Sequence, residues 1–123
     1  MANPNIVNVS TINGQTATAT LTTSAASIVS NAASSGKVFK INTIICANID
    51  GSNNADASVA INSAAAGAGS DKFLIKTVVV PADASLVVID KNSAFYLLEN
   101  QSITALASAA SDLDITISYE EIS

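Results

Sequence analysis

The segment Leu113–Ser123, LDITISYEEIS, decides the fold class, because apolar and polar side chains alternate along it one by one. Leu113, Ile115, Ile117 and Tyr119 would share one face of an extended chain, and the polar residues between them would share the other. A period of two is typical of a β-strand with one buried face and one solvated face. We therefore expect Ile115 to be a core residue whose truncation to alanine costs about 2–5 kcal/mol.

The same alternation recurs along the chain and predicts about eight strands. Residues 37–49, KVFKINTIICANI, carry an apolar row at odd positions that includes Ile45, together with apolar residues on the other face. A strand that is apolar on both faces is typical of the middle of a sheet, and we expect Ile45 to be buried there. Further strands are predicted at residues 16–22, 56–62, 72–80, 86–89 and 103–107, and shorter or less regular segments lie at 6–12, at 95–98 and within 24–36.

Turn residues separate these segments. Asn13-Gly14 predicts a two-residue hairpin, and Asp50-Gly51 opens a longer polar loop. Residues 62–71 predict a loop, because Gly67 and Gly69 would break any helix. Short strands without a helix of ten residues indicate an all-β protein, a two-sheet antiparallel β-sandwich of the jelly-roll or Ig-like kind.

The chain of 123 residues has the length of one domain, so we expect a single sandwich over residues 1–123. Residues 1–12 leave two alternatives open. They form either the first strand of the sandwich or an extended N-terminal arm that adds to the sheet of a neighbouring subunit.

Composition excludes several classes of function. Ten acidic residues against five lysines give a net charge of −5 and an isoelectric point near 4.2, so nucleic acid and anionic membranes are not expected partners. The sequence has no histidine, which removes Ser-His-Asp and Cys-His catalysis and histidine metal sites. We assign no catalytic, cofactor-binding or metal-binding residue and expect that the protein is not an enzyme.

Charged residues make up only 12% of the chain, against about 25% in ordinary globular domains. A surface with so little charge is expected to be partly covered by copies of the same chain or by a larger assembly. The start MANPNIVNVS has neither the basic residues nor the apolar stretch of a secretory signal, so synthesis in a cytoplasm is expected. The apolar stretch 73–80 is too short for a membrane helix.

Two groups of polar residues superficially resemble sites. Asp50, Ser52, Asn54 and Asp56 alternate as in a calcium loop, but Gly51 is misplaced for an EF-hand, and a polar loop that bonds its own backbone is the preferred interpretation.

Asp112 and Asp114 have the spacing of a glycosidase acid–base pair. We interpret them instead as solubilising charges of a turn and of a solvent-facing strand face. Glu120 and Glu121 are interpreted as a charged strand end that discourages aggregation between sheet edges.

Cys46 is predicted to be a small core residue, because burial without a neighbouring cation disfavours the thiolate. The lysines are spread over separate segments and predict no basic patch. Lys40 and Lys76 are expected to guard exposed strand faces. The lysine positions are Lys37, Lys40, Lys72, Lys76 and Lys91.

Residues 37–123 resemble small virion structural proteins of tailed bacteriophages, especially phages of marine bacteria and cyanobacteria. The resemblance rests on KVFKINTIICANIDGS (37–52) and on the segment 80–123. That segment holds a VPA turn, an aliphatic strand ending in Asp90-Lys91, an acidic Glu99-Asn100 turn, a DLD entry and the ending SYEEI.

The resemblance implies a non-enzymatic capsid decoration protein that binds the major capsid protein as a homo-oligomer, most simply a trimer. It would be located in the virion after synthesis in the host bacterial cytoplasm. A neck or tail subunit is the alternative within this class. A carbohydrate or host-surface binding module is the alternative of another class, and it is disfavoured because the sequence has no tryptophan and only Tyr96 and Tyr119 as tyrosines.

Overall fold

The computed structural model describes residues 4–123, and these residues form nine β-strands and one short 3-10 helix. The strands are β1 (Ile12–Thr20), β2 (Ala26–Asn31), β3 (Val38–Asn48), β4 (Ala55–Asn62), β5 (Asp71–Val80), β6 (Ser85–Ile89), β7 (Phe95–Leu97), β8 (Gln101–Ala107) and β9 (Leu113–Ile122), and the helix is η1 (Lys91–Ser93). Residues 4–123 contain no helix that is long and apolar enough to span a membrane.

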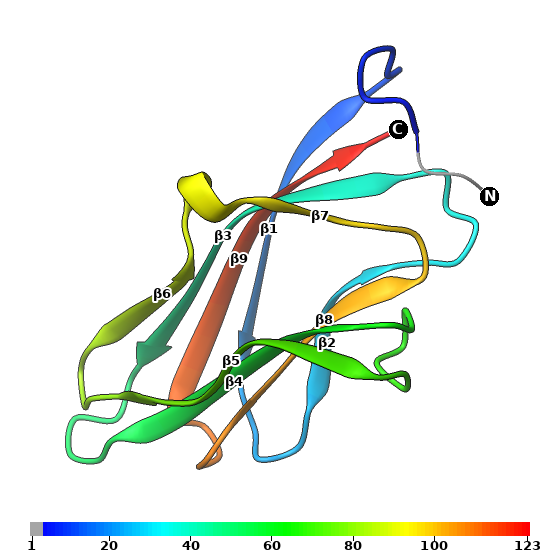
Figure 1. Cartoon of the computed structure of the whole chain (residues 1–123). Helices are drawn as coiled ribbons and strands as arrows, with labels where there is room; N and C mark the ends of the chain where they lie inside the picture. Colours follow the sequence, from blue (N-terminus) through cyan, green and yellow to red (C-terminus); the bar gives the residue numbers. More distant parts are fainter. Residues whose placement is uncertain (1–3) are drawn as a thin grey trace.

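The strands form two antiparallel sheets that face each other (Figure 1). Sheet A has the order β1-β9-β3-β6, with β7 also paired to β3, and sheet B has the order β2-β8-β4-β5. This arrangement confirms the predicted antiparallel β-sandwich. The chain crosses between the sheets at most connections and its first strand pairs with its last, which is the jelly-roll arrangement and not that of an immunoglobulin domain.

The core lies between the two sheets and is filled by aliphatic side chains from both. Ile115 and Ile117 of β9 are fully buried, as the alternation of this strand predicts. Ile103 of β8 and Val59 of β4 meet them from sheet B and are also fully buried. Burial of such side chains is the main stabilising contribution in a fold with so few aromatic residues.

A β-bulge in β3 overturns one core prediction. The pairing of β3 with β9 shifts register between Ile41 and Thr43. Ile41 is buried before the shift, whereas Ile44 and Cys46 are buried after it, so the buried face moves from odd to even positions. Ile45 is consequently only half-buried, and the prediction of a fully buried Ile45 is wrong.

The N-terminal part of the chain differs from the prediction at two places. Asn13 and Gly14 form no hairpin turn but lie within β1, opposite Glu121 and Glu120 of β9. Pairing with β9 holds this dipeptide in an extended ladder, and only the φ angles of Gly36 and Gly67 are positive among the described glycines. The predicted strand over residues 6–12 is also wrong, because β1 begins at Ile12.

Residues 4–11 form turns and coil. Of the predicted N-terminal arm, residues 1–3 lie outside the described part of the chain. The N–H groups of Ser10 and Thr11 both donate to the Ser123 carbonyl, at 2.6 and 3.1 Å, which attaches the end of this segment to the end of β9. Val7 is 90% exposed and has no part in the core.

Buried asparagines hold the loops at the ends of the sheets. Asn62 is 1% exposed, and its side chain donates to the Gly69 carbonyl and the Asp71 carboxylate and accepts from the N–H groups of Ala64 and Gly69. Asn31 and Asn48 bind neighbouring carbonyl groups in the same way. Each side chain satisfies backbone groups that would otherwise be buried without partners.

Candidate functional site: an open sheet edge

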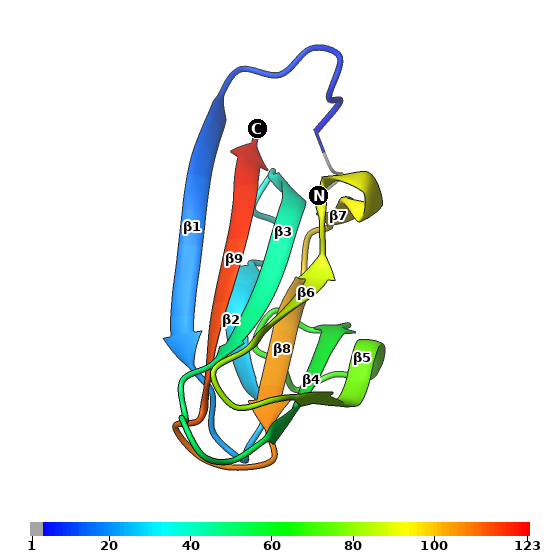
Figure 2. The same cartoon turned by 90° about the vertical axis from the view of Figure 1, so that its left-hand side faces the viewer.

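Strand β1 is an edge strand of sheet A. It pairs with β9 over its whole length, from Ile12 opposite Ile122 to Thr20 opposite Asp114. No other strand of residues 4–123 pairs with its second side. Figure 2 shows β1 at the left-hand margin of the molecule, with the preceding segment running across the top of the sheet and not along the strand.

The hydrogen bonds at the two ends of β1 show which backbone groups face the open side. Thr11 and Ser123 exchange both of their backbone hydrogen bonds, at 3.1 and 3.0 Å, and the Leu21 N–H donates to the Leu113 carbonyl at 2.8 Å. Bonded and non-bonded pairs alternate in an antiparallel ladder, so the odd-numbered residues of β1 bond to β9. The N–H and C=O groups that point to the open side belong to Ile12, Gly14, Thr16, Thr18 and Thr20.

This edge has none of the features that usually protect a sheet edge. Natural edge strands are made short, charged, irregular or proline-containing, because unpaired backbone groups recruit further strands. Strand β1 is nine residues long, its sequence INGQTATAT has neither charge nor proline, and its ladder with β9 has no register shift.

The other three edges carry such features. Strand β5 has the charged residues Asp71, Lys72 and Lys76, two register shifts opposite β4, a left-handed Thr77 with φ of 51°, and Pro81 directly after it. Strand β6 has only five residues. Strand β2 has six residues and a register shift opposite β8.

The open edge belongs to an uncharged part of the chain. Residues 1–36 contain no charged side chain, and all five lysines and ten acidic residues lie between Lys37 and Glu121. Strands β1 and β2 are both within this uncharged part, at one side of the sandwich. The predictions from sequence missed this site, although the confinement of every charge to the later part of the chain was a signal for it.

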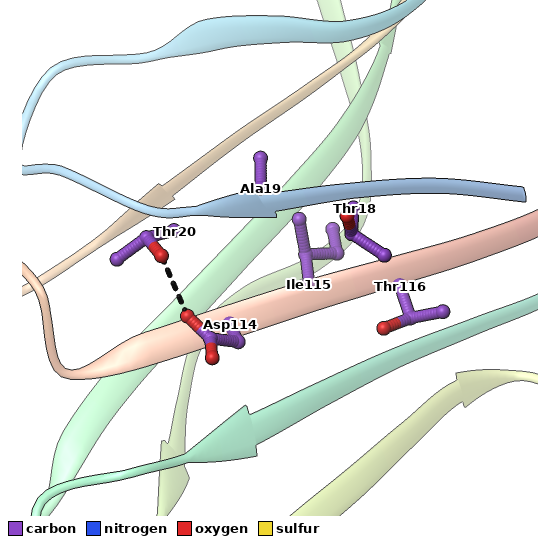
Figure 3. Close-up of a pocket in the computed structure, with 6 residues that line it drawn as sticks. All are labelled: Thr18, Ala19, Thr20, Asp114, Ile115 and Thr116. Carbon is purple, nitrogen blue, oxygen red and sulfur yellow. Dashed lines mark hydrogen bonds between the residues drawn. The ribbon is translucent and has the colours of Figure 1, made fainter.

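A shallow depression lies beside the open edge (Figure 3). Its volume is about 220 Å³, and it is lined by three residues of β1 and three of β9: Thr18, Ala19, Thr20, Asp114, Ile115 and Thr116. The Asp114 carboxylate accepts a hydrogen bond of 2.8 Å from the Thr20 hydroxyl, which links the two strands on their outer face. The depression is thus a feature of the same β1–β9 pair.

The loop after β3 bonds its own backbone, as the preferred interpretation of its sequence predicts. The Asp50 carboxylate accepts hydrogen bonds from the N–H of Ser52 at 2.8 Å, the N–H of Asn53 at 3.3 Å and the Asn53 side chain at 3.2 Å. These bonds hold the pKa of Asp50 below its ordinary value, and the bond from the Ser52 N–H has the largest effect. Among residues 4–123 no cluster of three or more His, Cys, Asp and Glu side chains could hold a metal ion.

The acidic residues near the C-terminus do not guard a sheet edge. Glu120 and Glu121 lie in β9, which runs between β1 and β3 inside sheet A, so their predicted role at an edge is wrong. Glu121 instead forms an ion pair with Lys37, with 3.1 Å between Nζ and Oε1. Asp112 lies in the turn before β9, and Asp114 lies beside Thr20.

The remaining side chains that could react or bind a ligand are the thiol of Cys46 and the two tyrosines. Cys46 is fully buried, as predicted, and burial raises its pKa to about 11. Tyr119 is stacked on Phe39 with 5.3 Å between ring centroids, and burial followed by the charge of Glu121 raises its pKa. Tyr96, 43% exposed, is therefore the tyrosine that is open to solvent.

No family model and no curated protein matches this sequence. The chain is similar in structure to a Bacillus endospore appendage protein from a family described as disulfide-linked pili. The TM-score is 0.54 and the sequence identity is 14%, and the alignment covers 92% of this chain and 87% of the other. At this identity the likeness supports the β-sandwich fold alone.

Proposed function

We propose that this chain is a non-enzymatic structural subunit, which acts by packing beside copies of itself and beside other proteins in a large particle. The observation that carries the proposal is the uncharged, unprotected β1 edge. An edge with free backbone groups over nine residues favours strand addition, which is a known mode of protein–protein recognition.

The particle that we propose first is a tailed-phage virion, with the chain as a capsid decoration protein on the major capsid protein. The resemblance of residues 37–123 to small virion proteins supports this proposal. A protein that binds the assembled shell, but not its free subunits, stabilises the shell by mass action. A neck or tail subunit of the same particle would use the same surface, and synthesis would take place in the host bacterial cytoplasm.

A filamentous appendage is the second candidate, and the fold shared with the endospore pilus protein favours it. Contacts that repeat head to tail without closing produce a fibre. Cys46 is the single cysteine of these 123 residues and is fully buried, so this chain would join such a fibre through strand pairing and not through its cysteine.

Mass spectrometry of purified phage particles tests the first proposal. A decoration protein should be present in a simple ratio to the major capsid protein, whereas a neck or tail subunit should be present at far lower copy number. Particles that lack the chain would overturn the virion proposal. Electron microscopy of the purified chain at high concentration then tests the second candidate, for which fibres are the expected result.

A glycan-binding screen separates both proposals from a carbohydrate-binding module. Sugar sites commonly use exposed aromatic rings, and Tyr96 is the solvent-open tyrosine of the described chain. A structural subunit should bind no glycan on the array. Binding that the substitution Tyr96→Ala abolishes would support the carbohydrate-binding class instead.

A further inference from the structure

We propose that two copies of this chain join through their β1 strands, antiparallel about a two-fold axis at Thr16, so that sheet A continues from one copy into the other. The proposal rests on the proposed structural function and specifies the contact through which two copies of the chain associate. The occupant of the open edge is thus the β1 strand of a second copy.

The register follows from the backbone groups on the open side. These groups belong to the even-numbered residues from Ile12 to Thr20, and antiparallel pairs have a constant sum of residue numbers. When Thr16 lies opposite Thr16 of the second copy, Gly14 lies opposite Thr18 and Ile12 lies opposite Thr20. All outward groups of both strands are then used, in about ten main-chain hydrogen bonds. Any other symmetric register leaves an end of each strand unpaired.

The side chains suit this register. No charged residue lies on either β1 strand, so the pairing brings no like charges opposite each other. Ile12 is 57% exposed in the single chain and would be partly covered by Thr20 of the second copy. Gly14 has open space around the position of a Cβ atom, so it offers no steric obstacle to Thr18.

The nearest charges lie one strand away from the contact. In this register Asp114 of β9 lies closest to Glu120 and Glu121 of β9 in the second copy, with the two β1 strands between them and a separation of about 14 Å or more. That distance exceeds the Debye length of about 8 Å at physiological ionic strength. Their repulsion is therefore screened, and the pairing should strengthen when salt is added to a low-salt buffer.

We choose β1 because the other edge strands have features that prevent strand addition. Strand β5 has charges, register shifts and a left-handed residue, and β6 and β2 are short. The residues before β1 are held elsewhere, because Ser10 and Thr11 bond to Ser123. The two-fold pair also differs from the trimer expected from the sequence, which makes the stoichiometry decisive.

Analytical ultracentrifugation over a range of micromolar concentrations tests the stoichiometry. We expect a monomer–dimer equilibrium that Thr16→Pro weakens at least about tenfold, because proline removes one outward N–H from each copy and no bond to β9. Thr16→Val keeps the N–H and is the matched control that should remain dimeric. Circular dichroism checks that each variant is folded.

Disulfide trapping tests the register independently of these variants. The Cα atoms of a bonded antiparallel pair are about 5.5 Å apart, which a disulfide can span, so Thr16→Cys should form covalent dimers on mild oxidation. Thr20→Cys is the control and should form none, because its counterpart lies about 27 Å away along the strand.

A monomer at all concentrations, a trimer, a dimer that Thr16→Pro leaves intact, or cross-linking of Thr20→Cys would overturn the proposed pairing. None of these results would remove the chain from purified particles, so failure of the pairing and failure of the proposed function are distinguishable.

Discussion

Each of the two sides of this sandwich has one edge strand from each sheet, but the two sides differ in the charge and regularity of these strands. On one side, β1 and β2 are uncharged, and β1 is long and regular. On the other side, β5 carries Lys72 and Lys76, and the Lys76 ammonium lies 5.1 Å from the centre of the Phe73 ring. The charged side is protected against strand addition, whereas the neutral side is open to it along β1.

This difference shows that one fold can prevent strand addition on one side and permit it on the other. The hydrophobic core does not distinguish the sides, because buried side chains anchor both. Leu21 follows β1 and Val80 ends β5, and both are 1% exposed. What separates the sides is therefore charge and backbone regularity, and the predictions below test each of these contributions.

The largest expected effect concerns the core anchors that the two sides share. Leu21→Ala should lower the free energy of unfolding by about 2–5 kcal/mol, because it leaves a cavity beneath the β1 side. Val80→Ala on the β5 side removes fewer methyl groups and should cost less, about 2 kcal/mol. Urea denaturation followed by circular dichroism measures both values. A negligible cost for Leu21→Ala would contradict the idea that both edges are anchored alike.

A smaller effect is expected for the asparagine that closes the β4–β5 connection. Asn62→Ala should destabilise the fold by about 1–3 kcal/mol, because buried backbone groups near Gly69 lose their partners. Asn13→Ala on the exposed β1 strand is the matched control and should change stability by less than about 0.5 kcal/mol. Thermal denaturation compares the pair. Equal effects would show that the Asn62 network is not stabilising.

Removal of charge from β5 should make the protected side resemble the open one. In the double variant Lys72→Thr/Lys76→Thr, we expect additional concentration-dependent association of about 1 kcal/mol, roughly a fivefold change in affinity. Light scattering after size-exclusion chromatography measures the mass. Lys91→Thr in η1 is the control and should behave like the parent chain. If the double variant associates no more than the control, backbone irregularity alone protects β5.

The smallest effect is expected from Asp50 in the loop after β3. Its pKa is lowered in the folded chain, so its stabilising contribution is present above the ordinary aspartate pKa of about 3.9 and is lost as the pH falls through the lowered folded value. Asp50→Asn should slightly lower the melting temperature at pH 7, and the difference should disappear in strong acid. A difference that stays constant with pH would contradict this assignment.

Much of the fold could be predicted from alternation, and the errors have physical causes. The period of two correctly placed the buried residues of β9, because that strand has a continuous inner face up to Ile117. It failed for Ile45, because a single bulge at Ile41–Thr43 exchanges the two faces and leaves no mark in hydrophobicity. It also failed at Asn13-Gly14, where pairing with a distant strand prevailed over local turn preference.

The candidate site was harder to predict than the fold. The absence of charge from residues 1–36 can be read from the sequence, and it indicates a neutral surface. Which strand becomes the open edge depends on β1 pairing with β9, and no local pattern encodes a contact between such distant segments. Sequence patterns could therefore predict that this surface is uncharged, but not that β1 is an edge strand of its sheet.

The pairing of the first strand with the last also has a consequence for how the chain reaches its native state. Thr20 and Asp114 are joined by a hydrogen bond although they are 94 positions apart. During synthesis on the ribosome, β1 therefore emerges long before the strand that will hold it. Contacts between such distant positions slow folding, since a long loop must close before they form. In that interval a neutral, strand-forming segment is available to any other nascent chain, so exchange of β1 between copies is the expected kinetic error of this fold.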